Sequence, residues 1–177
     1  MIRGIVALFV LVGAPLAAAQ EPAILNVPAP ELAGISGWFN TEPLKLADLK
    51  GKVVVLHFWT HGCINCIHNY PHLKAWHEQF SDKGAIVLGV HTPEFDMEKN
   101  LDRIKKKVKD NELKFPIAID NQGKTWAAWE NRWWPSVYLI DKKGVVRYGR
   151  AGELNSKNVQ GERVMRTKIE ELLKEEK

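Results

Sequence analysis

The residues best suited to chemistry are two cysteines, Cys63 and Cys66, separated by Ile64 and Asn65. In an exported protein, a cysteine pair is first considered as a structural disulfide. A bridge across so short a loop restricts the unfolded chain little and therefore adds little stability. The spacing instead favours thiol–disulfide exchange, in which one thiolate attacks a disulfide and the second thiol resolves the mixed disulfide.

The flanking residues predict that the pair lies between a strand and a helix. Residues 53–59 are apolar apart from His57, which is typical of a buried strand. Beyond the pair, apolar side chains recur every three or four residues as in a helix, at Ile64, Ile67, Tyr70, Leu73, Trp76 and Phe80. A helix N-terminus has unpaired N–H groups and a partial positive charge, which favour a thiolate. We therefore expect Cys63 to attack and Cys66, one turn deeper, to resolve.

The remaining patterns predict a single α/β domain with a central mixed sheet and helices on both faces. Pro71 is expected to kink the helix that follows the cysteines. Further strands are expected at residues 85–90, 115–119, 137–140 and 145–148, helices at 97–110 and 124–131 and through 164–173, and an N-terminal hairpin from 38–40 and 44–46.

The first residues have the pattern of a targeting segment. Arg3 is the only charged residue before Glu21, residues 5–16 are almost wholly apolar, and Ala17 to Ala19 are small. This is the layout of a secretory signal peptide at residues 1–19, cleaved after Ala19. Residues 20–36 contain three prolines and are expected to form an extended leader before a domain at residues 37–177. The mature protein is expected to be soluble in a bacterial periplasm or other extracytoplasmic space.

The charge balance gives no sign of a nucleic-acid partner. Lysine and arginine total 25 against 21 acidic residues, and the formal net charge of +4 is spread along the chain. Such a distribution is typical of a solvated surface.

Residues 58–66 resemble the active-site segment of the thioredoxin-like TlpA/ResA group. Pro71 matches the proline of the active-site helix in thioredoxins, and residues 134–136 resemble the cis-proline segment. Within this group the chain is most similar to the thioredoxin-like domain of DipZ-type cytochrome c biogenesis proteins, through residues 59–66, 89–95 and 134–141. The resemblance covers roughly residues 51–152, most of the expected mature chain.

The resemblance implies a thioredoxin fold over residues 37–177, with an added helix and strand between Val90 and Asp120. It assigns attack to Cys63 and resolution to Cys66. It also implies that Pro135 forms a cis peptide bond facing the disulfide and presents the backbone of Trp134 to an extended substrate, although an ordinary turn proline remains an alternative.

The implied reaction needs no cofactor. Its substrates are protein thiols and disulfides, as in cytochrome c or copper-site maturation. The resemblance favours a reductant, and the chain lacks the membrane electron-carrying region of the DipZ architecture. A separate membrane electron donor is therefore expected.

Three residues near the cysteines depart from the family pattern or flank the motif. His57 occupies the strand position of a buried acid in thioredoxin and is expected either to move protons or tune a thiolate, or to be a core histidine bonded to backbone. His61 is interpreted as a solvated tuning residue. Asn69 stands where some TlpA-type reductants carry a glutamate.

The tryptophans divide into two groups. Trp59, Trp133 and Trp134 are expected to form an apolar collar around the cysteines and to bind substrate. Trp76, Trp126 and Trp129 lie at helical spacings and are expected in the core.

Four other functions are alternatives to thiol–disulfide exchange for a chain with this cysteine pair. A peroxiredoxin-like peroxidase would fit Thr60 and Cys63, but the expected preceding proline is replaced by His57. A copper carrier would use the thiolates with His61, His68 or His91. The two cysteines could be half of a zinc site, but the sequence has no second ligand pair at comparable spacing, so no metal site is predicted. A redox-inert adaptor would have no need of both cysteines.

Overall fold

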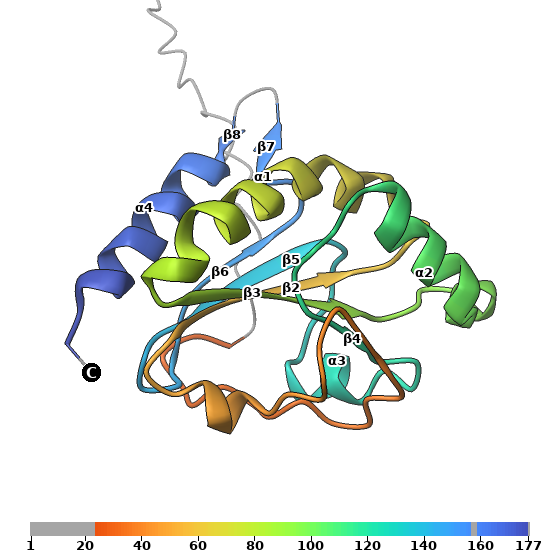
Figure 1. The fold of residues 1–177 in the computed structure, drawn as a ribbon, viewed down its shortest axis with the longest axis horizontal. Coiled ribbons are helices and arrows are strands. Elements are labelled where there is room, and N and C mark those ends of the chain that lie inside the picture. Colours follow the sequence, from red (N-terminus) through yellow and green to blue (C-terminus); the bar gives the residue numbers. More distant parts are fainter. Residues whose placement is uncertain (1–23, 157–158, 177) are drawn as a thin grey trace, which may run out of the picture.

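A computed structural model describes residues 24–156 and 159–176 and shows one mixed six-stranded sheet with helices packed against it (Figure 1). The strand order is β1-β4-β3-β2-β5-β6, with β2, β3 and β4 parallel and the other pairs antiparallel. These strands are β1 (Trp38–Phe39), β2 (Val53–Trp59), β3 (Ala85–His91), β4 (Ile117–Ile119), β5 (Ser136–Ile140) and β6 (Val146–Ala151). A separate pair joins β7 (Asn155–Ser156) to β8 (Val159–Gln160).

Strand β2 lies at the centre of the sheet because it is apolar on both faces. All seven of its residues are buried. Val53, Val55 and Trp59 enter one core cluster, whereas Val54, Leu56 and Phe58 enter the other. This alternation is the ordinary side-chain period of a strand, and two covered faces are what a parallel sheet requires.

Helices cover both faces of the sheet, as expected. The first cluster packs under α1 (Ile64–Phe80), α2 (Leu101–Asp110) and α4 (Gly161–Lys174), which lie on one side in Figure 1. The opposite side carries α3 (Lys124–Ala128). Pro71 lies inside α1. The added helix and strand between Val90 and Asp120 are α2 and β4.

The expected N-terminal hairpin is wrong. Trp38 and Phe39 pair with Ala118 and Ile117 of β4, so β1 extends the main sheet. No strand forms at residues 44–46, because Leu46 begins a 3-10 helix, η1 (Leu46–Leu49). Leu46 and Leu49 are both buried, and their three-residue spacing places both side chains on one face of that turn.

The helix expected at residues 97–110 is divided in two. A 3-10 helix, η3 (Asp96–Lys99), precedes Asn100, and α2 begins at Leu101. The Asn100 side chain accepts a hydrogen bond from the Arg103 N–H at 3.0 Å and so caps α2. A further 3-10 helix, η2 (Ser81–Lys83), continues the end of α1.

The described part of the leader lies along β6. The Asn26 N–H donates to the Val146 carbonyl at 2.7 Å, and the Val146 N–H donates to the Val27 carbonyl at 2.9 Å. Leader side chains also pack on the second core cluster. The expected signal peptide, residues 1–19, lies outside the described residues. Within residues 24–156 and 159–176, no helix has the length and hydropathy to cross a membrane.

His57 is a neutral core residue. It is fully buried, and neither ring nitrogen makes a hydrogen bond among the described residues. Burial lowers the pKa of His57 to about 3, because no nearby group compensates the charged form. His57 therefore carries no charge at neutral pH. The core position of His57 agrees with the core-histidine alternative, but its expected backbone hydrogen bond is absent among the described residues. Proton transfer by the neutral ring stays a prediction.

His91, at the end of β3, is a second buried histidine. Burial lowers the pKa of His91 to about 3, and the neighbouring His61 acts in the same direction. Both folded-state pKa values lie below the ordinary histidine value of about 6.5. The unfolded chain thus binds more protons below about pH 6.5, and stability present above that pH is lost as the pH falls.

Replacing His57 with leucine is expected to reduce this pH dependence. The free energy of unfolding of the unmodified protein should fall between pH 6.5 and 5 by up to about 1.4 kcal/mol per pH unit for each buried histidine. Denaturant titrations of both proteins across this range measure the slope. In H57L this slope should be smaller by up to about 1.4 kcal/mol per pH unit. An unchanged slope would show that His57 accepts a proton in the folded state.

Candidate active site

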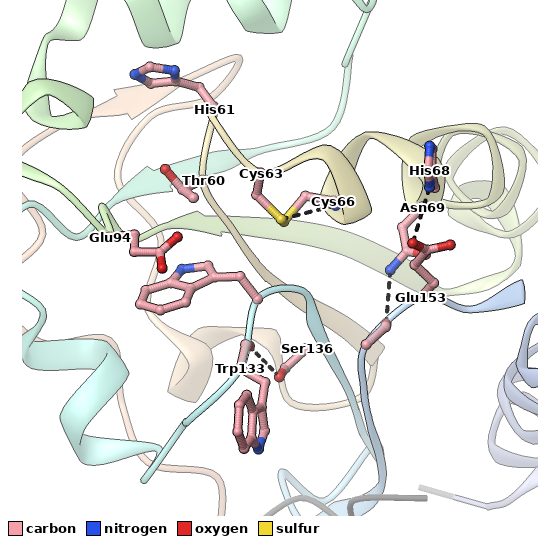
Figure 2. The surroundings of a disulfide bond; sticks show 12 residues. Thr60, His61, Cys63, Cys66, His68, Asn69, Glu94, Trp133, Ser136 and Glu153 are labelled. Carbon is pink, nitrogen blue, oxygen red and sulfur yellow. Dashed lines mark hydrogen bonds and ion pairs between the residues drawn. A yellow bond between two sulfur atoms is a disulfide. The ribbon is translucent and has the colours of Figure 1, made fainter. Parts of the chain in front are cut away.

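The two cysteines lie at the turn that connects β2 to α1. Strand β2 ends at Trp59 and α1 begins at Ile64, so Cys63 is the N-cap residue of the helix. Cys63 and Cys66 form a disulfide with their Cα atoms 5.3 Å apart (Figure 2). The Cys66 N–H donates to the Cys63 sulfur at 3.1 Å. In the reduced protein this donor and the helix N-terminus both stabilise negative charge on Cys63.

The two sulfurs differ in access. Cys66 is fully buried, whereas Cys63 is only half-buried. A protein substrate can reach Cys63 but not Cys66 while the helix is intact. This asymmetry agrees with the expected roles of Cys63 in attack and Cys66 in resolution.

The segment before β5 lies among the surroundings of the disulfide (Figure 2). The Trp134–Pro135 peptide bond is cis, as expected. The Trp134 indole stacks on Trp126 with centroids 3.9 Å apart and donates to the Thr92 carbonyl at 2.9 Å. Among the described residues, no hydrogen bond uses the backbone N–H or C=O of Trp134. Its side chain is therefore anchored while its backbone remains available.

The tryptophans do not form the expected collar as a set. Trp59 is fully buried and meets the rings of Tyr70 and His91 edge to face, with centroids at 5.7 and 5.0 Å. It cannot contact a substrate, and that prediction is wrong because β2 directs this side chain into the core under α1. Trp133 is 49% exposed and is the collar residue most accessible to solvent. The expected core residues Trp76 and Trp129 are fully buried, and Trp126 is partly buried.

Asn69 joins the active-site helix to the segment after β6. It is fully buried, its side-chain oxygen accepts from the Leu154 N–H at 2.8 Å, and its amide donates to the Gly152 carbonyl at 3.5 Å. The Gly152 N–H in turn donates to the Pro135 carbonyl at 2.7 Å. A chain of hydrogen bonds thus connects the turn after Cys66 to the cis-proline segment. Figure 2 shows the Asn69 end of this chain.

A polar cluster supports the other side of the cysteine turn. The His61 N–H donates to Nε2 of His91 at 3.2 Å, and the Thr60 hydroxyl lies 3.3 Å from the same nitrogen. The His61 ring stacks on His91 with centroids 5.7 Å apart. Because His91 Nε2 accepts the His61 N–H, the neutral ring of His91 is the form that holds the turn.

His61 is less solvated than expected for a tuning residue. Its Nε2 atom is buried and has no hydrogen-bond partner in the described structure. Burial lowers the pKa of His61 below its ordinary value; Glu98 opposes this effect, whereas Lys107 and Arg103 reinforce it. His61 is therefore uncharged at neutral pH and supplies no positive charge to Cys63.

The histidines considered as copper ligands do not converge on the cysteines. His68 faces Glu153 at 3.2 Å on the outer side of α1 (Figure 2). Nε2 of His91 already accepts a hydrogen bond from the backbone N–H of His61, in the turn before Cys63. Among residues 24–156 and 159–176, no group of three or more histidine, cysteine or acidic side chains is arranged to hold a metal ion. The copper-carrier alternative thus gains no support.

Sequence reasoning missed the contribution of Glu98. The residue follows the 89–95 segment closely, but a lone glutamate in a charged stretch gives no sign of burial. Its side chain is only 4% exposed and accepts hydrogen bonds from the N–H groups of Glu94 and Phe95 at 2.7 and 3.2 Å.

Comparison with known proteins places the chain in a family. The AhpC/TSA family matches residues 26–149. Protein DipZ of Mycobacterium tuberculosis is 44% identical over 128 residues, which cover 71% of this chain and 18% of DipZ. Thiol-disulfide oxidoreductase ResA of Bacillus cereus is 31% identical over 118 residues, which cover 67% of this chain and 65% of ResA. The chain thus spans less than two thirds of either relative.

A solved structure supports the same assignment. The thioredoxin-like superfamily protein SPOA0173 superposes with a TM-score of 0.75 and 32% identity, covering 85% of this chain and 98% of that protein. The fold, the cysteine pair at disulfide distance and these relatives agree. The chain belongs to the AhpC/TSA family and, within it, to the thioredoxin-like TlpA/ResA group of thiol–disulfide oxidoreductases.

Proposed function

We propose that the protein is an exported reductant of protein disulfides, acting for example in cytochrome c or copper-site maturation. The observation that carries this proposal is the partly exposed Cys63 at a helix N-terminus, with Cys66 buried one turn deeper. Export is supported by the signal-peptide pattern of residues 1–19. The resemblance of residues 59–66, 89–95 and 134–141 to DipZ-type cytochrome c biogenesis proteins supports the link to cytochrome c maturation.

The reaction transfers two electrons from the cysteine pair to the substrate. The Cys63 thiolate attacks a substrate disulfide, forms a mixed disulfide and releases one substrate thiolate, which takes up a proton. The Cys66 thiolate then attacks the Cys63 sulfur, which closes the Cys63–Cys66 disulfide and releases the second substrate thiol. A separate membrane protein dithiol would return the two electrons by the same exchange.

The backbone of Trp134 is the proposed docking point for the substrate. An extended substrate segment can pair with its available N–H and C=O, as a strand adds to an edge. Trp133, 49% exposed, and Ile64, 61% exposed, provide apolar surface on residues that adjoin the docking point and Cys63. In this arrangement the backbone of Trp134 binds substrate, and the buried Pro135 orients that backbone through the cis peptide bond. Trp59 only supports the helix from below.

The reduction potential of the Cys63–Cys66 pair distinguishes a reductant from an oxidant. We expect a value near that of thioredoxin, about −270 mV, when residues 20–177 equilibrate in defined thiol buffers. A value near that of DsbA, about −120 mV, would mark a disulfide donor and contradict the proposed direction. A pair that never forms the disulfide would contradict the oxidoreductase assignment.

Single-cysteine variants test the order of attack. Cys66→Ser should accumulate a mixed disulfide with a disulfide-bearing protein, because the resolving thiol is missing. Cys63→Ser should accumulate little, because Cys66 is buried. Non-reducing electrophoresis measures both adducts; equal trapping by the two variants would refute the assigned roles.

Replacing Asn69 with alanine should impair protein substrates selectively. The change leaves the buried Leu154 N–H without its partner, costs about 1–3 kcal/mol of stability and releases the segment that holds Pro135. We expect a higher KM for a protein disulfide with a nearly unchanged rate towards a small aromatic disulfide. His68→Ala is the matched control, since its exposed pair with Glu153 contributes at most about 1 kcal/mol. Equal losses for both substrates would assign Asn69 a purely structural role.

A further inference from the structure

Glu98 lies against the turn that carries the attacking cysteine. A Cβ atom at Gly62, the residue before Cys63, would collide with Oε1 of Glu98. The carboxylate therefore lies against the backbone of the residue that precedes Cys63. Its other oxygen is held by the N–H groups of Glu94 and Phe95. The side chain therefore bridges the segment after β3 and the turn after β2.

The Glu98 carboxylate is ionised at neutral pH. Burial alone would raise the pKa of Glu98, but hydrogen bonds from the Glu94 N–H, the Thr60 hydroxyl and the Phe95 N–H outweigh burial and lower it below its ordinary value. A buried ionised group close to Cys63 is screened by salt less than a surface charge.

The groups around this carboxylate do not neutralise it. The pKa of His61 and that of His91 are both lowered chiefly by burial, so neither ring is charged at neutral pH. Arg103 and Lys107 of α2 are the cations close enough to influence His61. Both side chains are at least partly exposed to solvent, so water weakens their effect on the carboxylate.

We propose that Glu98 is a positioning residue that holds the active-site turn and, by its negative charge, disfavours the Cys63 thiolate and keeps the Cys63–Cys66 pair reducing. The helix N-terminus and the Cys66 N–H favour the thiolate, and Glu98 opposes them. A less stable thiolate means a less stable reduced form and hence a lower reduction potential. This inference rests on the proposed function and concerns what sets its direction.

Glu98→Gln tests the charge, because the amide oxygen can still accept the two N–H groups. We expect the Cys63 thiolate pKa, measured by absorbance at 240 nm, to fall by about 0.5–1 unit, a threefold to tenfold change. Above that pKa the reduction potential should rise by about 15–30 mV, since tenfold corresponds to 29.6 mV. Both shifts should persist in 0.5 M salt, unlike those of an exposed charge.

Asp96→Asn is the control, because it removes a carboxylate charge from an exposed position of the same 3-10 helix. Shifts in E98Q no larger than those in D96N, or abolished by 0.5 M salt, would overturn the proposal. Gly62→Ala provides a second variant that displaces the carboxylate by steric contact while retaining its charge, and its potential should move in the same direction as that of E98Q.

The outcomes separate this inference from the proposed function. The potential of the unmodified protein tests whether the pair is a reductant. The difference between that protein and E98Q tests only Glu98. An unmodified protein with a potential like that of DsbA, raised further in E98Q, would refute the proposed direction and support the assignment of Glu98.

Discussion

The parallel pairing of β2 with β3 is the constraint on which the active site depends. The register sets Trp59 opposite His91, so the two strands end together at one edge of the sheet. The chain after β2 must turn into α1 there, and the chain after β3 must turn into η3 beside it. The cysteine turn and the segment that supports it meet because both strands are buried and hydrogen-bonded along their length. Cys63 becomes a helix cap because of this geometry.

Two opposing electrostatic effects act on Cys63 at that edge. The helix N-terminus and the Cys66 N–H favour negative charge on its sulfur. The Glu98 carboxylate acts in the opposite sense, and the histidines around it are kept neutral by burial. Buried histidines in this site therefore contribute shape and hydrogen-bond acceptance, as His91 does for the His61 N–H, and no charge.

Much of the fold and the centre of the site could be predicted from sequence because their signals are local. The apolar run of β2, the spacing of the cysteines and the periodicity of α1 all lie within residues 53–80. Contacts between distant segments gave no such signal. Asn69 binds a residue 85 positions away, and β1 pairs with a strand about 80 positions away, so neither partner could be read from the neighbouring sequence. Periodicity also cannot distinguish a surface tryptophan from the buried Trp59.

Asn69 and Glu98 support opposite sides of the disulfide, which separates two properties of the enzyme. Asn69 reaches Pro135 through Gly152 and so acts on the surface proposed to receive the substrate. Glu98 touches the turn before Cys63 and acts on the attacking sulfur. Among the described residues the two networks share no hydrogen-bonded residue. We therefore expect substitutions at Asn69 to change the affinity for a protein substrate, and substitutions at Glu98 to change the potential of the cysteine pair, nearly independently of each other.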